Sequence, residues 1–251
     1  MLKALIFDVD GTLADTESAH RAAFNQAFLE VGRDWVWDEP TYKQLLGISG
    51  GKERIFHYWQ QVQPDIKQIS SSAKQDVVNY MHELKTAIYG RAVHNGEVKL
   101  RPGVLRLIEE AHVKGMRLAI ATTTSPTNIS ALLREAIGLD WSHYFQVIED
   151  ASTAPLKKPH PQVYLQTLRR MKLDPAHCLA FEDSANGLRA AMASGLATVI
   201  TTNAFTEDHD FAGALRVLPN LERITLADLH EWHADLAEHA LVANDHRGSY
   251  P

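Results

Sequence analysis

Two acidic residues, Asp8 and Asp10, stand where a short apolar run, residues 4–7, leads to Gly11. The run predicts a buried strand that carries both carboxylates into a turn. Side chains alternate along a strand, so both acids would face the same side if the strand continued that far. Two buried carboxylates repel each other and lose hydration, and a cation or a shared proton would offset both costs.

A pair of this kind suits covalent catalysis. One carboxylate attacks an electrophile and becomes modified, while the second moves protons to and from the oxygen that leaves or enters. The alternative is an ordinary surface turn, because aspartate and glycine are common turn residues and an aspartate side chain can accept a backbone hydrogen bond. The six residues from Phe7 to Thr12 leave both interpretations open.

The composition indicates a chain that folds in water. Its 251 residues are 45% hydrophobic, which is ample for a core. No run reaches the length of about 18 apolar residues that a membrane span needs. The first three residues lead directly into the expected strand, so we expect no signal peptide and a cytoplasmic location. With a net charge of −6 and no basic run, we expect a monomer that binds a small molecule and neither nucleic acid nor a membrane.

Helical periodicity follows the acidic turn for a long way. Helices are expected over residues 17–31, 41–46, 52–62 and 73–88, and nothing between residues 15 and 98 alternates like a strand. From residue 101 onward strands and helices alternate. Strands are expected at 116–121, 145–148, 178–181 and 196–200, and helices within 102–115, 125–138, 161–171, 184–194 and 226–241. Residues 246–251 are expected to fray.

This alternation predicts an α/β fold with a mostly parallel sheet that is covered by helices on both faces. The helical block is then an insertion. It divides the chain into a catalytic core of residues 1–14 and 99–251 and a helical domain of residues 15–98. Hinges are expected near residues 15–16 and 96–102. Sites in such sheets lie beyond the carboxyl ends of the strands.

Polar side chains follow four of the expected strands: Asp8 with Asp10, Thr122, Lys158, and Glu182 with Asp183. Acids at two strand ends make a site for a hard cation, and Mg²⁺ is the expected one. Lys158 would neutralise charge on a transferring phosphoryl group and hold Asp8 ionised. Thr122 would offer a hydroxyl and nearby backbone N–H groups. A solvated loop lysine is the alternative for Lys158.

Four segments resemble the motifs of haloacid dehalogenase-like phosphatases: residues 7–12, the strand that ends at Thr122, Lys158-Pro159, and residues 181–187. The resemblance covers essentially the whole chain and implies a Rossmann-like core. It implies that Asp8 is the nucleophile that becomes an aspartyl phosphate and that Asp10 is the general acid and base. It also implies a Mg²⁺ ion held by Asp8, Asp183 and the backbone carbonyl of Asp10, with Glu182 close by, and a phosphoryl group bound by Thr122 and Lys158.

The inserted helices resemble the mobile cap of the β-phosphoglucomutase-like subgroup. Such caps close over a substrate, exclude water and supply specificity. Within the cap, residues 50–54 offer free backbone N–H groups, a positive helix end and two cations, which together suit a second anionic group of the substrate. An ordinary helix start is the alternative. The residues expected around the substrate are Asp8, Glu17, His20, Tyr42, Gly50, Gly51, Lys52, Glu53, Arg54, Thr122, Thr123, Thr124 and Lys158.

Residues 16–25 and 50–54 are similar to those of the CbbY proteins, a family encoded with Calvin-cycle genes. That similarity implies hydrolysis of xylulose 1,5-bisphosphate, an inhibitor of Rubisco, to xylulose 5-phosphate and phosphate. Residue chemistry alone indicates only a phosphorylated sugar with two anionic ends. Two alternatives stay open: a sugar phosphomutase that shares the aspartyl phosphate, and a noncatalytic metal-dependent binding module.

Overall fold

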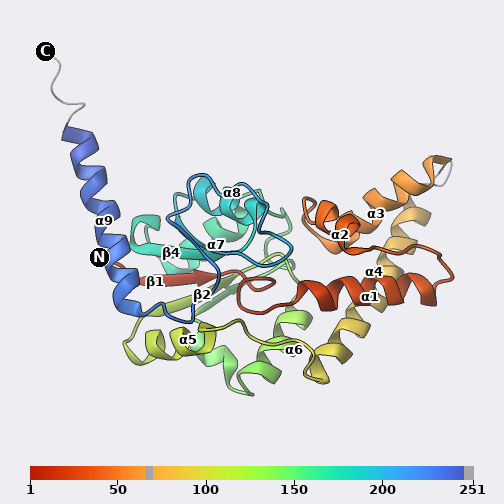
Figure 1. The fold of residues 1–251 in the computed structure, drawn as a ribbon, viewed down its shortest axis with the longest axis horizontal. Helices are drawn as coiled ribbons and strands as arrows, with labels where there is room; N and C mark the ends of the chain where they lie inside the picture. The colour runs from red at the N-terminus through yellow and green to blue at the C-terminus, as the bar shows by residue number, and fades with distance from the viewer. Residues whose placement is uncertain (66–69, 246–251) are drawn as a thin grey trace, which may run out of the picture.

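A six-stranded sheet forms the centre of the molecule in the computed structural model, which describes residues 1–65 and 70–245 (Figure 1). The strand order is β3-β2-β1-β4-β5-β6, and every pair is parallel. The predicted α/β fold with a parallel sheet is therefore confirmed. The strands are β1 (Ala4–Phe7), β2 (Arg117–Ala121), β3 (Val147–Glu149), β4 (Cys178–Glu182), β5 (Ala197–Thr201) and β6 (Arg216–Leu218).

The central strand β1 is an unbroken apolar run because helices cover both of its faces. Its last residue, Phe7, lies beside Ile120 of β2 and Phe181 of β4 in the register of the sheet. Since parallel strands end at the same edge, the residues that follow β1, β2 and β4 emerge side by side. Asp8, Thr122 and Glu182 are thereby brought to one place by the sheet alone.

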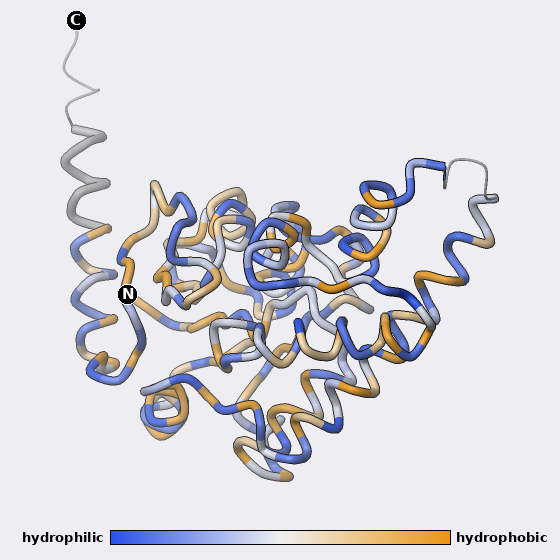
Figure 2. Tube along the Cα trace, turned by 45° about the vertical axis from the view of Figure 1, so that its right-hand side comes forward, coloured by the Kyte–Doolittle hydropathy of each residue, from blue (hydrophilic) through white to orange (hydrophobic). Residues whose placement is uncertain are grey.

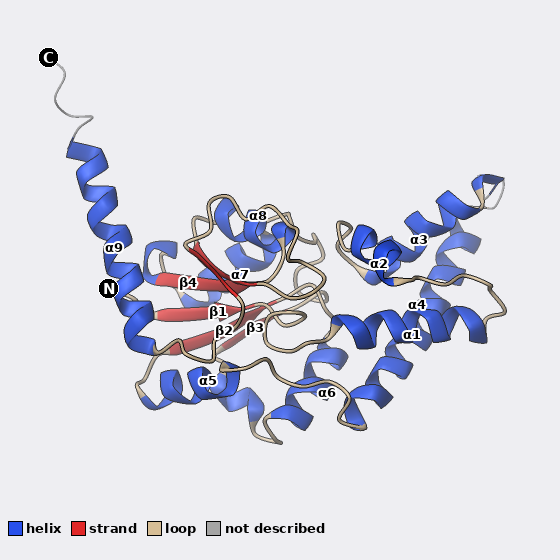
Figure 3. Ribbon diagram, viewed as in Figure 1, coloured by secondary structure: helices blue, strands red, loops and turns tan. Residues whose placement is uncertain are grey.

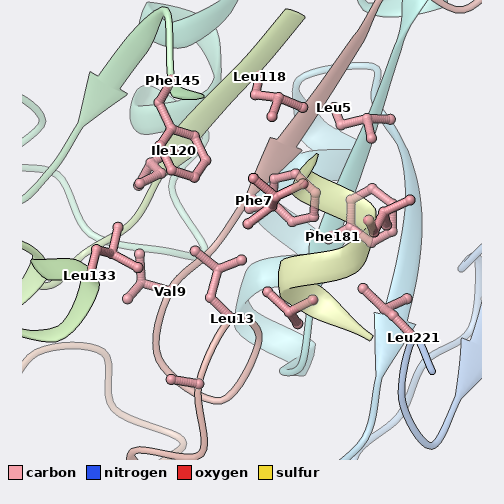
Figure 4. Close-up of a cluster of buried hydrophobic side chains, with 14 of the residues drawn as sticks. Leu5, Phe7, Val9, Leu13, Leu118, Ile120, Leu133, Phe145, Phe181 and Leu221 are labelled. Atoms are coloured by element: carbon pink, nitrogen blue, oxygen red, sulfur yellow. The ribbon is translucent and has the colours of Figure 1, made fainter. Parts of the chain in front are cut away.

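Helices pack on both faces of the sheet (Figure 3). Helices α5 (Val104–Val113) and α6 (Pro126–Ala136) lie on one face, and α7 (Gln162–Met171) and α8 (Ala185–Ala193) lie on the other. Alternate residues of β1 enter the two apolar cores that result. In one of them the rings of Phe7 and Phe181 stack with centroids 4.6 Å apart (Figure 4).

Four further helices, α1 (Glu17–Glu30), α2 (Glu39–Leu45), α3 (Gly51–Val62) and α4 (Ser71–His94), lie together beyond one end of the sheet. Figure 2 shows apolar residues interspersed with polar ones along this part of the chain. Large rings form an aromatic cluster among them: Phe24, Phe28, Trp35, Trp37, Tyr42 and Trp59. We propose that α1–α4 are the cap.

The two connections between the cap and the sheet run side by side. Ala14 and Leu100 form a β-bridge, Asp15 N–H donates to the carbonyl of Lys99, and Arg101 N–H donates to that of Leu13. The guanidinium of Arg101 donates to backbone carbonyls from three other parts of the core, those of Gly11, Thr201, Thr202 and Pro219. The connections are thus fixed to the catalytic core at one point.

Helix α4 extends beyond its predicted end at residue 88. Gly90 lies inside it, and glycine disfavours a helix by about 1 kcal/mol relative to alanine. However, Tyr89 and Val93 are buried on its inner side, and this packing outweighs the propensity. Strand β3 starts two residues later than predicted because a short 3₁₀ helix, Trp141–Tyr144, precedes it.

The last helix, α9 (Leu226–Asp245), leaves the sheet near the N-terminus. Residues 246–251, for which fraying is predicted, lie outside the described part of the chain. Within residues 1–65 and 70–245, no helix combines the length and apolar character needed to cross a membrane.

Candidate active site

Three carboxylates meet at the carboxyl edge of the sheet. Asp8 follows β1, Glu182 ends β4 and Asp183 follows it, and one oxygen from each lies within 4.8 Å of the others. All three side chains are buried. This acidic cluster contains three of the four acids that we expected around a metal ion.

The fourth acid, Asp10, directs its carboxylate elsewhere. Strand β1 ends at Phe7, and residues 9–14 form a turn in which Gly11 has a φ of 75°. The alternation of a strand therefore does not reach Asp10, so the condition under which both side chains would share one face of a strand is not met, although both residues line the same cavity. The carboxylate of Asp10 accepts a hydrogen bond from His20 Nε2 at 3.0 Å instead. The role of its backbone carbonyl as a ligand stays a prediction.

The chemistry of the acidic cluster fits a hard divalent cation. Glu182 Oε2 is buried and has no hydrogen-bond partner among the described residues. Two glycines leave the space that the carboxylates occupy: a Cβ at Gly187 would collide with Glu182, and one at Gly11 would collide with Asp183. Oxygen ligands and buried negative charge are what Mg²⁺ prefers, so the residues present fit this ion.

Lys158 is the cation that the structure itself places among these acids. Its Nζ lies 2.7 Å from Asp8 Oδ1, 2.5 Å from Glu182 Oε1 and 3.0 Å from the carbonyl of Ala121. Tyr164 also donates to Glu182 Oε1. The predicted placement of Lys158 at the acidic centre therefore matches the geometry.

Burial and Lys158 have opposite effects on the pKa of Asp8. Burial, together with the nearby Glu182 and Asp10 charges, raises the pKa of Asp8 to about 7, while Lys158 opposes the shift. Burial and the neighbouring carboxylates also raise the pKa of Asp183. A bound metal would favour the ionised form of Asp8, because a cation favours the charged form of its ligands.

A lysine that sequence reasoning missed, Lys85 of α4, completes the surroundings of Asp10. Lys85 Nζ lies 2.8 Å from His20 Nδ1, and its side chain is buried beside the rings of Phe24 and Tyr89. An ammonium group can only donate, so Nδ1 accepts and Nε2 carries the proton that His20 donates to Asp10. Lys85 therefore fixes the tautomer of His20.

We predict that Lys85→Met lowers kcat by about 10-fold to 100-fold. General acid–base catalysis contributes about 10²-fold to 10⁴-fold, and part of this is lost because Asp10 stays in place but is no longer oriented through His20. Burial, together with the charge of Arg54, lowers the pKa of Lys85 to about 8, and Asp10 and Glu17 oppose the shift. Lys85 is charged below that pH, so activity of the unmodified enzyme should fall as pH rises through about 8.

The measurement is kcat between about pH 6 and about pH 10. In Lys85→Met the decline near pH 8 should be absent, whereas the exposed Lys114→Met should retain it. An unchanged alkaline decline in Lys85→Met would show that another group titrates.

The acidic cluster opens into a cavity of about 820 Å³ between the sheet and helices α1, α3 and α4. Thr122, Thr123 and Thr124 line it beside Asp8, and Thr124 N–H donates to Thr122 Oγ1 at 3.3 Å. From the cap side it is lined by these predicted residues: Glu17, His20, Gly50, Gly51, Lys52, Glu53 and Arg54. The structure thus places both sets around one space.

Tyr42 is the exception among the residues expected around the substrate. It is 0% exposed, does not line the cavity and donates its hydroxyl to Glu17 Oε2 at 2.6 Å. The expectation that Tyr42 lies around the substrate is therefore corrected: its hydroxyl supports Glu17, which does line the cavity. Arg54 Nε donates to the carbonyl of Ile48 at 2.8 Å, which holds the arginine at the cavity wall.

Comparison with known proteins agrees with this geometry. Residues 2–195 match the family model of the haloacid dehalogenase-like hydrolases. The CbbY protein of Cupriavidus necator is 52% identical over 220 residues, 88% of this chain and 86% of that protein.

Two solved structures are also similar. CbbY from Rhodobacter sphaeroides in complex with phosphate has a TM-score of 0.81 at 40% identity over 90% of this chain and 98% of the other. A mutant of the same protein in complex with xylulose 1,5-bisphosphate has a TM-score of 0.81 at 39% identity and the same coverage. The predicted resemblance is confirmed: the chain belongs to the haloacid dehalogenase-like hydrolases and, within them, to the family of the CbbY proteins.

Proposed function

We propose that this enzyme is a Mg²⁺-dependent phosphatase that hydrolyses a phosphorylated sugar through a covalent phosphate on Asp8. The observation that carries this proposal is the meeting of a buried carboxylate, Asp8, with Lys158 and the acidic cluster at the floor of a cavity whose far wall holds cations. The cluster suits phosphoryl transfer, in which catalysis consists mainly of positioning and charge stabilisation.

In the first step an oxygen of Asp8 attacks the phosphorus atom. The bond between phosphorus and the sugar oxygen breaks, its electron pair stays on that oxygen, and Asp10 supplies the proton. In the second step water attacks the phosphorus of the aspartyl phosphate and gives its proton to Asp10. The bond to Asp8 then breaks, phosphate leaves, and both aspartates return to their starting states.

Asp10 is prepared for this exchange by its neighbours. Burial would raise its pKa, but His20, Lys85 and Thr16 outweigh burial and lower it. These neighbours therefore favour the carboxylate, which is the form left after the first step and the form that accepts a proton from water. A bound phosphate dianion beside it raises the pKa of Asp10, since a like charge disfavours ionisation, and so favours the protonated form that the first step requires.

Asp8, Asp183 and the backbone carbonyl of Asp10 would hold Mg²⁺, with Glu182 beside them. When bound, the ion screens the carboxylates from the phosphate and withdraws charge from the transferring group. Lys158 and Thr122 would contact the phosphoryl oxygens from the other side.

The substrate that we propose is xylulose 1,5-bisphosphate, with xylulose 5-phosphate and phosphate as products. Its support is the identity with CbbY proteins, one of which binds this compound in a solved structure. Arg54 and Lys52 line the cavity opposite Asp8, which supports a substrate with an anionic group at each end. Removal of an inhibitor of Rubisco would place the enzyme beside the Calvin cycle.

We predict that Arg54→Ala lowers kcat/KM for the bisphosphate by about 10-fold to 100-fold, the loss of one charge-assisted hydrogen bond of about 1.5–3 kcal/mol. Turnover of p-nitrophenyl phosphate, which has one anionic group, should change by less than about 3-fold. Arg91→Ala, which removes an exposed arginine of α4, is the matched control and should leave both unchanged. Equal losses on both substrates in Arg54→Ala would contradict a second anion site.

A sugar phosphomutase is the rival within the same chemistry, because it returns the phosphoryl group of Asp8 to another hydroxyl instead of to water. The two are separated by measuring phosphate release and isomer formation from one sample with Mg²⁺. We expect one phosphate released for each bisphosphate consumed. Isomer formed without phosphate would reverse the assignment.

A further inference from the structure

The loop of residues 202–209, which follows β5, touches both the acidic cluster and the cap. At its start Asn203 Nδ2 donates to Asp183 Oδ2 at 2.8 Å. The other end of the same amide, Asn203 Oδ1, accepts from Phe205 N–H at 2.9 Å. One side chain therefore joins a carboxylate of the acidic cluster to the backbone of Phe205.

Phe205 belongs to the core by sequence but packs into the aromatic cluster of the cap. Its ring meets that of Tyr42 edge-on, with centroids 5.8 Å apart and planes at 87°. It is only 8% exposed. Two residues further on, Glu207 lies 3.5 Å from Lys43 of α2. The cap thus rests on this loop.

Hydrogen bonds within the loop make its residues move together. Thr206 N–H and Glu207 N–H both donate to the carbonyl of Asn203, and Asn203 N–H donates to Thr206 Oγ1. A movement of Asn203 must therefore move Phe205 with it. Tyr42, which Phe205 touches, in turn holds Glu17 at the wall of the cavity. The chain of contacts runs from the acidic cluster to the substrate side of the cap.

We propose that Asn203 and Phe205 are positioning residues that couple metal binding at Asp183 to docking of the cap. A cation that orders Asp183 also orders Asn203 and so favours the loop conformation on which the cap rests. Coupling between two equilibria is reciprocal, so docking of the cap strengthens metal binding by the same factor. The inference rests on the metal ion of the proposed function, but on no particular substrate.

The experiment measures amide hydrogen exchange of residues 41–49 with and without Mg²⁺, in the full chain and without substrate. In the unmodified protein Mg²⁺ should slow this exchange by about 5-fold or more, the lower end of typical allosteric couplings. In Phe205→Ala it should slow exchange by less than about 2-fold, while calorimetry shows that Mg²⁺ still binds. Phe205→Leu, which preserves apolar contact with Tyr42, should restore part of the effect.

Phe211→Ala is the matched control, because Phe211 follows the same loop but is not part of the aromatic cluster. It should respond to Mg²⁺ as the unmodified protein does. Asn203→Leu, which removes both hydrogen bonds, should abolish the slowing and weaken Mg²⁺ binding by about 10-fold.

The coupling would be overturned if Mg²⁺ slowed amide exchange in Phe205→Ala as much as in the unmodified protein. It would also be overturned if bound Mg²⁺ did not change amide exchange in the unmodified protein. Either result combined with normal hydrolysis of the sugar phosphate leaves the proposed function intact. Slowing by Mg²⁺ without hydrolysis of any sugar phosphate would support the coupling and contradict the phosphatase. Absence of Mg²⁺ binding would overturn both.

Discussion

Asp8→Asn is expected to abolish turnover, with kcat reduced by about 10⁴-fold to 10⁶-fold, the range seen when an enzyme loses its nucleophile. Asparagine matches the shape of aspartate, but its amide oxygen is neutral and cannot form a stable acyl phosphate. The side chain of residue 8 is buried against Lys158. The measurement is phosphate release in a burst and in steady state.

Asp15→Asn provides the control for this substitution. Asp15 is exposed at the connection to the cap, so the same chemical change there should leave kcat within about 2-fold, as is usual for surface positions. An Asp8→Asn protein with full activity would contradict the covalent mechanism. It would indicate that the acidic cluster belongs to a noncatalytic metal-dependent binding module and that hydrolysis takes place at another site.

Gly187→Ala is expected to weaken Mg²⁺ binding by about 10-fold to 100-fold, since groups that orient metal ligands contribute this much to affinity. The new methyl group would occupy the space of the Glu182 carboxylate. Glu182 is 0% exposed and is held on its other side by Lys158 and Tyr164, so it cannot withdraw without breaking these bonds. We expect kcat at a fixed, subsaturating Mg²⁺ concentration to fall by a similar factor.

Stability measurements distinguish this effect from unfolding. Gly187 lies in α8, where alanine favours a helix by about 1 kcal/mol over glycine, while overpacking costs about 1–3 kcal/mol. The free energy of unfolding without metal should therefore fall by no more than about 2 kcal/mol. Gly90→Ala, in α4, should raise it by about 1 kcal/mol, because among the described residues no atom outside the adjacent helix backbone lies within 4 Å of the added Cβ. A Gly187→Ala protein that binds Mg²⁺ normally would show that Glu182 moves freely.

Most of the acidic cluster could be predicted from the sequence because it depends on local signals. An apolar run that stops at an acid identifies the end of a strand, and a parallel sheet brings such ends to one edge. These signals were sufficient to place Asp8 and Glu182 of the cluster, and Thr122 beside them, at that edge. The orientation of Asp10 could not be derived from the same rule, because the strand ends at Phe7 and Gly11 turns the chain before alternation reaches Asp10.

The partners across the cap could not be predicted in this way. Lys85 lies 65 positions from His20, and nothing local indicates that the two side chains meet. Its only sequence signal is its position on the buried side of α4, four residues after Met81 and four before Tyr89, where a lysine requires a partner. Asn203 and Tyr42 are likewise defined by contacts between distant segments rather than by any pattern around them.

The paired connections at Ala14 and Leu100 have a consequence for how such enzymes can change. Both ends of the inserted helices leave the core at neighbouring points, and Arg101 secures that junction from the core side. An insertion whose ends lie together can be exchanged without altering the strands beneath it. Specificity for a new compound can therefore arise when a different helical segment replaces the inserted one, while the residues that break the phosphate ester bond stay unchanged.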